Sequence, residues 1–421
     1  MKASRSIFRN RSFRLYFGMN LSSRTAGAVA TVSVVWFVFA VTHSAIDVAI
    51  IGIAASVGTV AMTLPAGVWV DRHDRRGLLL LTNVVRAASL AALVVVTALL
   101  GFQLAVLTAF NFIWSAASEL YRSADHSVLP ELVEASEIAD ANGVTMAGYN
   151  LLGSVSNALG GALIVLVGAL VAFSYSAAGY IAAVGFSLLM LHGRKNSAGR
   201  RSARRRGEGG MGSEITEGMR WLVSQRGLFG LSLSAVIFNF FLSITFYFLV
   251  VYVALAAKGG ALLFGTILAA FVIGNAGGSL LVGRTQAIRH TGKTWLLLNG
   301  ALMGALTILM GAFPLAPVAI AAALAQGLAG GFGGNVWLTS AQNIVPAAMR
   351  GRYFAIDGLL SFIGGAPAIA VGGIAVTILG VVSVYEISGI VLLLTALAFT
   401  MMKSLWKLDG SVNVNEGMSE V

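Results

Sequence analysis

A short polar segment between two apolar stretches places one carboxylate among several guanidinium groups. Asp71 is followed by Arg72, Arg75 and Arg76, and Gly67 lies about one helical turn before it. Such a carboxylate can form an ion-pair network that exists in only one of two arrangements of neighbouring helices, and a glycine permits close helix contact. The segment therefore predicts a switchable electrostatic contact.

Two further arginines, Arg24 and Arg86, lie inside apolar stretches. At a helix rise of about 1.5 Å per residue, both sit roughly 14 Å from the nearer helix end. A charge at that depth costs about 2.5–3.5 kcal/mol, so each side chain should face protein or water. We expect no carboxylate at this depth, and structural hydrogen bonding for Arg86 but substrate binding for Arg24. The groups expected to solvate them are an anionic or carbonyl-rich substrate, or Asn20, Ser23, Asn83 and Asn111.

The elements that position these residues are membrane-spanning helices. Of the 421 residues, 57% are hydrophobic and 11% are charged, whereas about a quarter of a soluble domain is charged. The absence of cysteine excludes disulfides and thiolate metal sites. Charge-free runs of about 20 residues or more predict an all-α integral membrane protein. We expect twelve helices in two six-helix halves, beginning near residues 14, 46, 77, 103, 140, 169, 227, 260, 294, 316, 354 and 382.

Three of the apolar runs must contain a turn. The run 141–193 is expected to fold back near Gly168, the run 294–349 at the two prolines within 313–317, and the run 87–118 at 101–103. Prolines and glycines at these points interrupt a helix.

The positive charges fix the expected orientation. With both termini inside, the inner segments hold 25 of the 28 Lys and Arg residues, the outer loops hold Lys258 alone, and Arg24 and Arg86 lie within helices. Cytoplasmic loops of membrane proteins carry this excess. The net charge of +11 therefore predicts contact with the lipid bilayer and no nucleic-acid partner. We expect halves at 1–193 and 227–404, a basic cytoplasmic linker at 194–226 and a cytoplasmic tail at 405–421.

The two halves also resemble each other in sequence. Pro130 and Pro346 end similar tripeptides, Val-Leu-Pro and Ile-Val-Pro, and the same offset of 216 residues relates Gly67 to Gly283. A parallel repeat of this kind is typical of transporters built from two six-helix halves.

The segment from Gly67 to Arg76 reads GVWVDRHDRR and resembles the signature Gly-x-x-x-Asp-Arg-x-x-Arg-Arg of the major facilitator superfamily. LPELV at 129–133, with Ala141-Asn142-Gly143, resembles its macrolide-efflux and enterobactin-exporter branch. Two departures stand out: Ala287 replaces the aspartate of the second copy, and 156–161 reads SNALGG, without the proline of the antiporter pattern.

The resemblance implies roles for individual residues. It implies a cytoplasmic gate in which Asp71 lies near the start of the eleventh helix and Arg75 or Arg76 lies near Asp357. Arg122, expected at the inner end of the fourth helix, is another candidate partner for Asp71. It also implies that the first, fourth, seventh and tenth helices line a central path. The expected cavity residues there are Arg24, Asn111, Trp114, Asn239, Phe240, Tyr247, Gln326 and Asn335. The carboxylates expected near the path, as proton carriers or as boundary charges, are Glu119, Glu386 and Asp47, besides Asp357.

The helix pattern predicts a membrane transporter, and the resemblance implies a secondary active transporter in the plasma membrane that exports an amphipathic small organic molecule by alternating access, driven by proton antiport. No catalytic residues, cofactor or metal are expected, and a monomer suffices. An importer or uniporter on the same fold remains an alternative. A membrane-embedded enzyme is the second class, but the chain has no cysteine, and its five histidines lie at or near expected helix ends.

Overall fold

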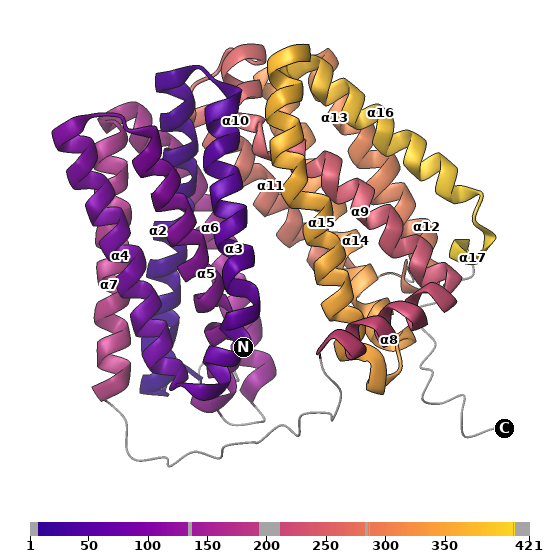
Figure 1. Ribbon diagram of the computed structural model, residues 1–421, viewed down its shortest axis with the longest axis horizontal. Coiled ribbons are helices and arrows are strands. Elements are labelled where there is room, and N and C mark those ends of the chain that lie inside the picture. The colour runs from indigo at the N-terminus through magenta and orange to yellow at the C-terminus, as the bar shows by residue number, and fades with distance from the viewer. Residues whose placement is uncertain are drawn as a thin grey trace. The chain divides into compact units, whose positions relative to one another are not determined.

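The computed structural model describes residues 7–133, 137–192, 211–282, 285, 287–406 and 408. Figure 1 shows the ribbon as a set of long helices, and no strand occurs in these ranges. Nine helices of the described chain are long and apolar enough to cross a membrane, and shorter apolar helices add to them. The described part of the chain is therefore all-α, and its helices have the length and composition that spanning a membrane requires.

The chain packs as two compact units. The first comprises the described residues within Met1–Ala198 and Val253–Ala269, and the second those within Gly199–Tyr252 and Ala270–Val421. The first unit contains α2 (Arg11–Thr42), α3 (Ala45–Arg72), α4 (Arg75–Leu100), α5 (Leu104–Leu132), α6 (Ile138–Val167) and α7 (Ala169–His192).

The second unit begins with α8 (Met211–Ser224), which lies inside the segment expected to be a polar linker. Residues 194–210 of that segment fall outside the described residues. The remaining elements are α9 (Arg226–Tyr247), α10 (Leu249–Val251), the π-helix η2 (Tyr252–Ala256), α11 (Ala261–Leu281), the 3₁₀-helix η4 (Ala287–His290), α12 (Thr291–Trp295), the π-helix η5 (Leu296–Leu302), α13 (Met303–Ala312), α14 (Ala316–Ile344), α15 (Ala347–Leu379), α16 (Val381–Thr400) and α17 (Lys403–Trp406). Of these, η2 and α11 contribute residues to both units.

The helix boundaries follow local signals in the sequence. The Asn10 side chain accepts hydrogen bonds from the backbone N–H groups of Ser12 and Phe13 at the start of α2, and such side chains satisfy donors that lack a helical partner. Gly168, with φ of +85°, separates α6 from α7 as expected. The expected turns at 101–103 and 313–317 are also confirmed.

Two helices extend beyond their expected limits. α15 begins at Ala347 rather than near residue 354, and α5 continues to Leu132 although charged residues interrupt its apolar run from Glu119 onward. The expected end of the fourth helix near residue 122 was therefore wrong. The extra turns of α5 pack into the core of the first unit, where Ala124, Val128 and Leu129 are buried, and Asp125 is buried as well.

The first unit is held together by direct helix contacts. A Cβ added to Gly58 on α3 would lie 2.3 Å from the carbonyl oxygen of Phe112 on α5, so only glycine permits this approach. Figure 1 also shows α4 and α7 side by side, and these two helices pack against each other along their length.

Candidate functional site

A buried polar network joins α2 and α5 in the first unit. Asp125 Oδ1 accepts a hydrogen bond from Asn20 Nδ2 at 3.0 Å, and Asp125 Oδ2 lies 3.9 Å from Arg24 Nη2. Asn20 is fixed in turn, because its Oδ1 accepts from the Tyr121 hydroxyl at 2.7 Å and its Nδ2 also donates to the Tyr16 carbonyl at 3.3 Å. The network thus contains a carboxylate, a guanidinium, an amide and a phenol.

Helical spacing explains why these groups meet. Asn20 and Arg24 are four residues apart on α2, and Tyr121 and Asp125 are four apart on α5. Residues at this spacing share one helix face, so two polar pairs face each other across the helix contact. The expectation that no carboxylate lies at the depth of Arg24 is therefore wrong. The four-residue spacing of Tyr121 and Asp125 is visible in the sequence. Asp125 was overlooked because the fourth helix was expected to end near residue 122.

The two charged members of the network differ in exposure. The Arg24 side chain is 43% exposed and the Asp125 side chain 6% exposed. An exposed guanidinium in the interior of a spanning helix would be costly in hydrocarbon. We therefore expect Arg24 to face water, whereas Asp125 is buried within the protein.

Arg86, the other arginine within an apolar stretch, is enclosed by protein groups. It donates to Asn83 Oδ1 at 2.7 Å and to the Thr82 carbonyl at 3.3 Å. Its guanidinium carbon lies 4.0 Å from the centroid of the Tyr121 ring and 4.9 Å from that of Tyr180. Cation–π contacts of this kind stabilise a desolvated guanidinium by about 2 kcal/mol.

The remaining groups expected to solvate these arginines have other positions. Asn111 Nδ2 donates to the Leu107 carbonyl of its own helix at 2.8 Å. The buried Ser23 hydroxyl has no hydrogen-bond partner among the described residues.

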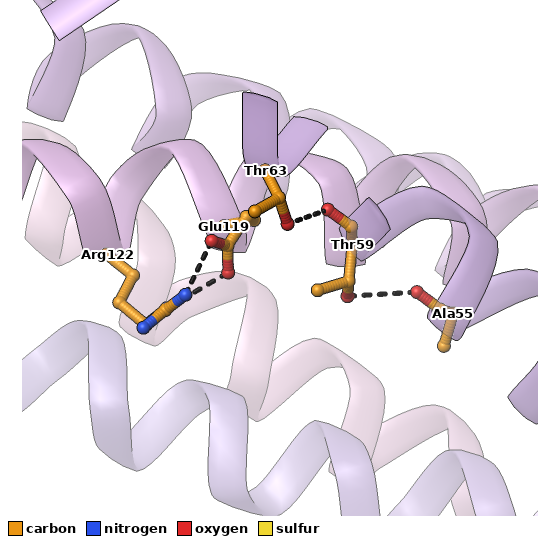
Figure 2. Close-up of polar contacts among 5 residues, drawn as sticks. All are labelled: Ala55, Thr59, Thr63, Glu119 and Arg122. Carbon is orange, nitrogen blue, oxygen red and sulfur yellow. Dashed lines mark hydrogen bonds and ion pairs between the residues drawn. The ribbon is translucent and has the colours of Figure 1, made fainter. Parts of the chain in front are cut away.

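A second ion pair of the first unit lies on one face of α5. Arg122 Nε and Nη2 donate to the two carboxylate oxygens of Glu119 at 2.9 and 2.6 Å. Figure 2 shows this pair with Thr59 and Thr63 of the neighbouring α3, whose hydroxyls donate to carbonyl oxygens of their own helix. Glu119 is buried, so its charge is balanced by Arg122 from the same helix.

The residues expected at the gate are distributed over both units. Asp71 belongs to the last turn of α3, but its side chain lies outside the described positions. Arg75 donates to the Ser127 carbonyl at 3.1 Å and pairs with Glu131 at the end of α5. Arg72 is exposed, Arg76 is half-buried, and Asp357 is half-buried on α15 in the second unit.

Gly67 is exposed, and a Cβ there would meet no described atom within 4 Å. Within the first unit the close contact between α3 and α5 is made instead at Gly58, a residue that the motif did not single out.

The other expected cavity residues have partners within their own unit. Trp114 Nε1 donates to the Tyr180 hydroxyl at 3.1 Å. In the second unit, Gln326 donates to the Thr307 hydroxyl at 3.0 Å and Asn335 to the Ser279 hydroxyl at 2.9 Å. Asn239 is half-buried on α9. The rings of Phe240 and Tyr247 contact their neighbours Phe241 and Phe248.

The two remaining carboxylates expected near the path lie at helix ends. Asp47 is in the first turn of α3, next to the capping residue Ser44, and is half-buried. Glu386 is half-buried on α16, and a Cβ on Gly311 of α13 would lie 2.8 Å from its Cγ. No group of three His, Cys, Asp or Glu side chains suited to a metal ion occurs within the described part of the chain.

One known protein family matches nearly the whole chain. A family model described as "Transmembrane secretion effector" matches residues 3–415. No curated protein sequence matches this chain significantly.

Solved structures share the fold over nearly their full length. A bacterial homologue of the iron transporter ferroportin in its inward-facing state has a TM-score of 0.71 and 14% identity, covering 93% of this chain and 98% of that one. A bacterial homologue of the human lysosomal transporter Spinster has a TM-score of 0.66 and 17% identity, covering 97% and 99%. A POT family transporter in complex with 5-aminolevulinic acid has a TM-score of 0.70 and 13% identity, covering 93% and 96%. At these identities the likeness establishes a common fold only.

Proposed function

The chain belongs to the transmembrane secretion effector family, and from this premise we propose that it exports an amphipathic small organic molecule. Export would occur across the plasma membrane by alternating access, with both termini cytoplasmic and with proton antiport as the driving force. The protein is a multi-pass membrane transporter of the major facilitator type. The family description supports the outward direction. The resemblance of LPELV at 129–133 supports the macrolide-efflux and enterobactin-exporter branch.

One observation carries the proposal of a solute path. Arg24 exposes its guanidinium group in the interior of a helix that is long and apolar enough to span the membrane. Such a group is stable there only in contact with water or a polar solute. A water-filled path along α2 accounts for this exposure, and hydrocarbon does not.

An amphipathic organic solute suits the other residues expected along the path. Trp114 is half-buried on α5, and a Cβ on Gly27 of α2 would lie 3.6 Å from its ring. Ligand sites combine apolar and aromatic walls with a small number of polar groups. The amides and aromatic rings of Asn239, Phe240 and Tyr247 on α9 are of the same kind.

Proton antiport is proposed because titratable carboxylates are expected near the path and the available energy is sufficient. One charge moving through 100 mV supplies about 2.3 kcal/mol, which supports roughly fifty-fold accumulation. Glu119, Asp47 and Glu386 remain the proposed proton carriers. No cofactor or metal is needed for this cycle, and one chain suffices for it.

The test is transport by purified protein in proteoliposomes with an imposed pH gradient. Inverted and right-side-out vesicles should be loaded with a panel of labelled amphipathic compounds. We expect uptake into inverted vesicles that requires the gradient. Export that persists after both the pH gradient and the membrane potential are collapsed would refute proton coupling. Accumulation only in right-side-out vesicles would identify an importer, the alternative on this fold.

The second class, a membrane-embedded enzyme, has less support. The structural relatives are transporters. Conversion of a panel compound into a new product by the purified protein would favour an enzyme, and recovery of unchanged compound inside the vesicles would favour transport.

A further inference from the structure

We propose that Arg24 binds an anionic group of the transported solute, such as a carboxylate, phosphate or sulfonate, and that Asp125 is the internal counter-ion from which Arg24 turns to bind it. This inference rests on the proposed transport function and names the substrate class of its path. Four observations support it.

The first observation is the order in which a solute meets the two charges. Arg24 is the exposed member of the pair, and Asp125 is buried beneath it. A solute entering from the aqueous side therefore encounters a guanidinium group before a carboxylate. An organic cation would meet like charge first, whereas an anion meets a group suited to it.

The second observation is the looseness of the ion pair. Arg24 Nη2 and Asp125 Oδ2 are 3.9 Å apart, which is too long for a hydrogen bond. The Glu119–Arg122 pair in the same unit has donor–acceptor distances of 2.6 and 2.9 Å and uses both carboxylate oxygens. A planar anion could form short bidentate bonds with Arg24 that Asp125 does not form.

The third observation is that Asp125 keeps a donor when Arg24 turns away. Asn20 donates to Asp125 Oδ1 at 3.0 Å, and the Tyr121 hydroxyl holds Asn20 in that orientation. A hydrogen bond to the charged form stabilises a carboxylate. Asp125 therefore keeps its position and a donor when Arg24 turns to a solute.

The fourth observation is an aromatic wall on the same helix faces. Trp114 and Asp125 are eleven residues apart on α5, which is about three turns. The Trp114 ring lies against α2 at Gly27, less than one turn from Arg24. An anionic head at Arg24 and an apolar body at Trp114 would fit one solute, so the proposed substrate is an amphipathic anion.

The experiment measures equilibrium binding to the full chain in detergent by isothermal titration calorimetry. The probes are 2-naphthoate and its neutral counterpart 2-naphthamide. The wild-type protein should bind naphthoate at least tenfold more tightly than naphthamide. Arg24→Gln should weaken naphthoate binding at least tenfold, and Arg24→Lys should weaken it less. Arg14→Gln, the same change at an exposed arginine of the same helix, should leave it unaltered.

Asp125→Asn separates the counter-ion role from a structural one. Removing the competing carboxylate should tighten naphthoate binding severalfold while leaving naphthamide unaffected. Size-exclusion profiles and apparent melting temperatures identify variants that do not fold. If Asp125→Asn does not fold, Arg24→Gln and Arg24→Lys decide the question by themselves.

Three results would overturn the inference: equal affinity of the wild type for the two probes, no naphthoate binding at millimolar concentration, or equal loss of both probes in Asp125→Asn. The outcome is distinguishable from failure of the proposed function. Selective anion binding without flux in proteoliposomes would refute transport and leave the anion site standing. Flux of neutral compounds that is unaffected by Arg24→Gln would support transport and refute the anion site.

Discussion

The Glu119–Arg122 pair allows a quantitative prediction about stability. Arg122 donates twice to Glu119, whose side chain is 8% exposed, whereas its own side chain is 62% exposed. Water can therefore solvate the arginine but not the carboxylate. We predict that Arg122→Gln is more destabilising than Glu119→Gln, because only the first change leaves a buried charge without its partner.

The magnitude follows from the geometry. Two unit charges about 4 Å apart attract by about 4 kcal/mol at an effective dielectric constant near 20. Exposure of Arg122 screens part of this attraction, so Arg122→Gln should cost about 2 kcal/mol. Glu119→Gln leaves a solvated arginine and should cost less than about 1 kcal/mol. The double variant should recover about half of the loss, since replacing both partners removes the buried charge.

The assay is the apparent melting temperature of purified protein in one detergent, measured for the wild type, both single variants and the double variant. Arg14→Gln is the matched control, because it removes an exposed arginine. The order of melting temperatures should be control, Glu119→Gln, double variant, Arg122→Gln, from highest to lowest. Equal losses in the two single variants would refute the argument from unequal solvation.

The same variants bear on proton coupling. If Glu119 is a proton carrier, Glu119→Gln should abolish transport driven by a pH gradient while nearly retaining the melting temperature. Gradient-driven transport at the wild-type rate in this variant would assign Glu119 a structural role only.

Two further predictions concern α3. Asp71→Asn should abolish transport while leaving membrane insertion intact, because it removes the charge expected at the gate. The control Asp74→Asn should retain transport, since Asp74 caps α4 and asparagine also caps helices. Normal vesicle transport by the Asp71 variant would exclude the gate. Gly58→Val should destabilise the first unit by about 1–3 kcal/mol through overpacking against Phe112. The control Gly185→Ala should be neutral, because a Cβ there meets no described atom within 4 Å. Equal melting temperatures of these two variants would contradict the packing argument.

Much of the architecture follows from the order of residues along the chain. Apolar runs and their interruptions placed the starts of α2 to α7 within three residues of the observed ones, and Gly168 marked a turn inside a double-length run. These features depend on local properties, namely the thickness of the bilayer and the conformational limits of glycine and proline.

The end of α5 shows where a linear rule fails. The rule ends a spanning helix where charges begin, but Glu119, Arg122 and Asp125 remain helical because each finds a partner within the first unit. The sequence alone could not show that α5 continues beyond Glu119, because the length of an apolar run contains no information on which helix packs beside it.

The sequence by itself determined the membrane class, the helix starts and the presence of an arginine within α2. Only the tertiary structure decided that Asp125 lies beneath Arg24, that Arg75 contacts Glu131, and that Gly58 rather than Gly67 makes the close contact between α3 and α5. The physical reason is that insertion into a bilayer depends on the summed properties of one segment, whereas an ion pair depends on two segments, distant in sequence, whose faces must meet.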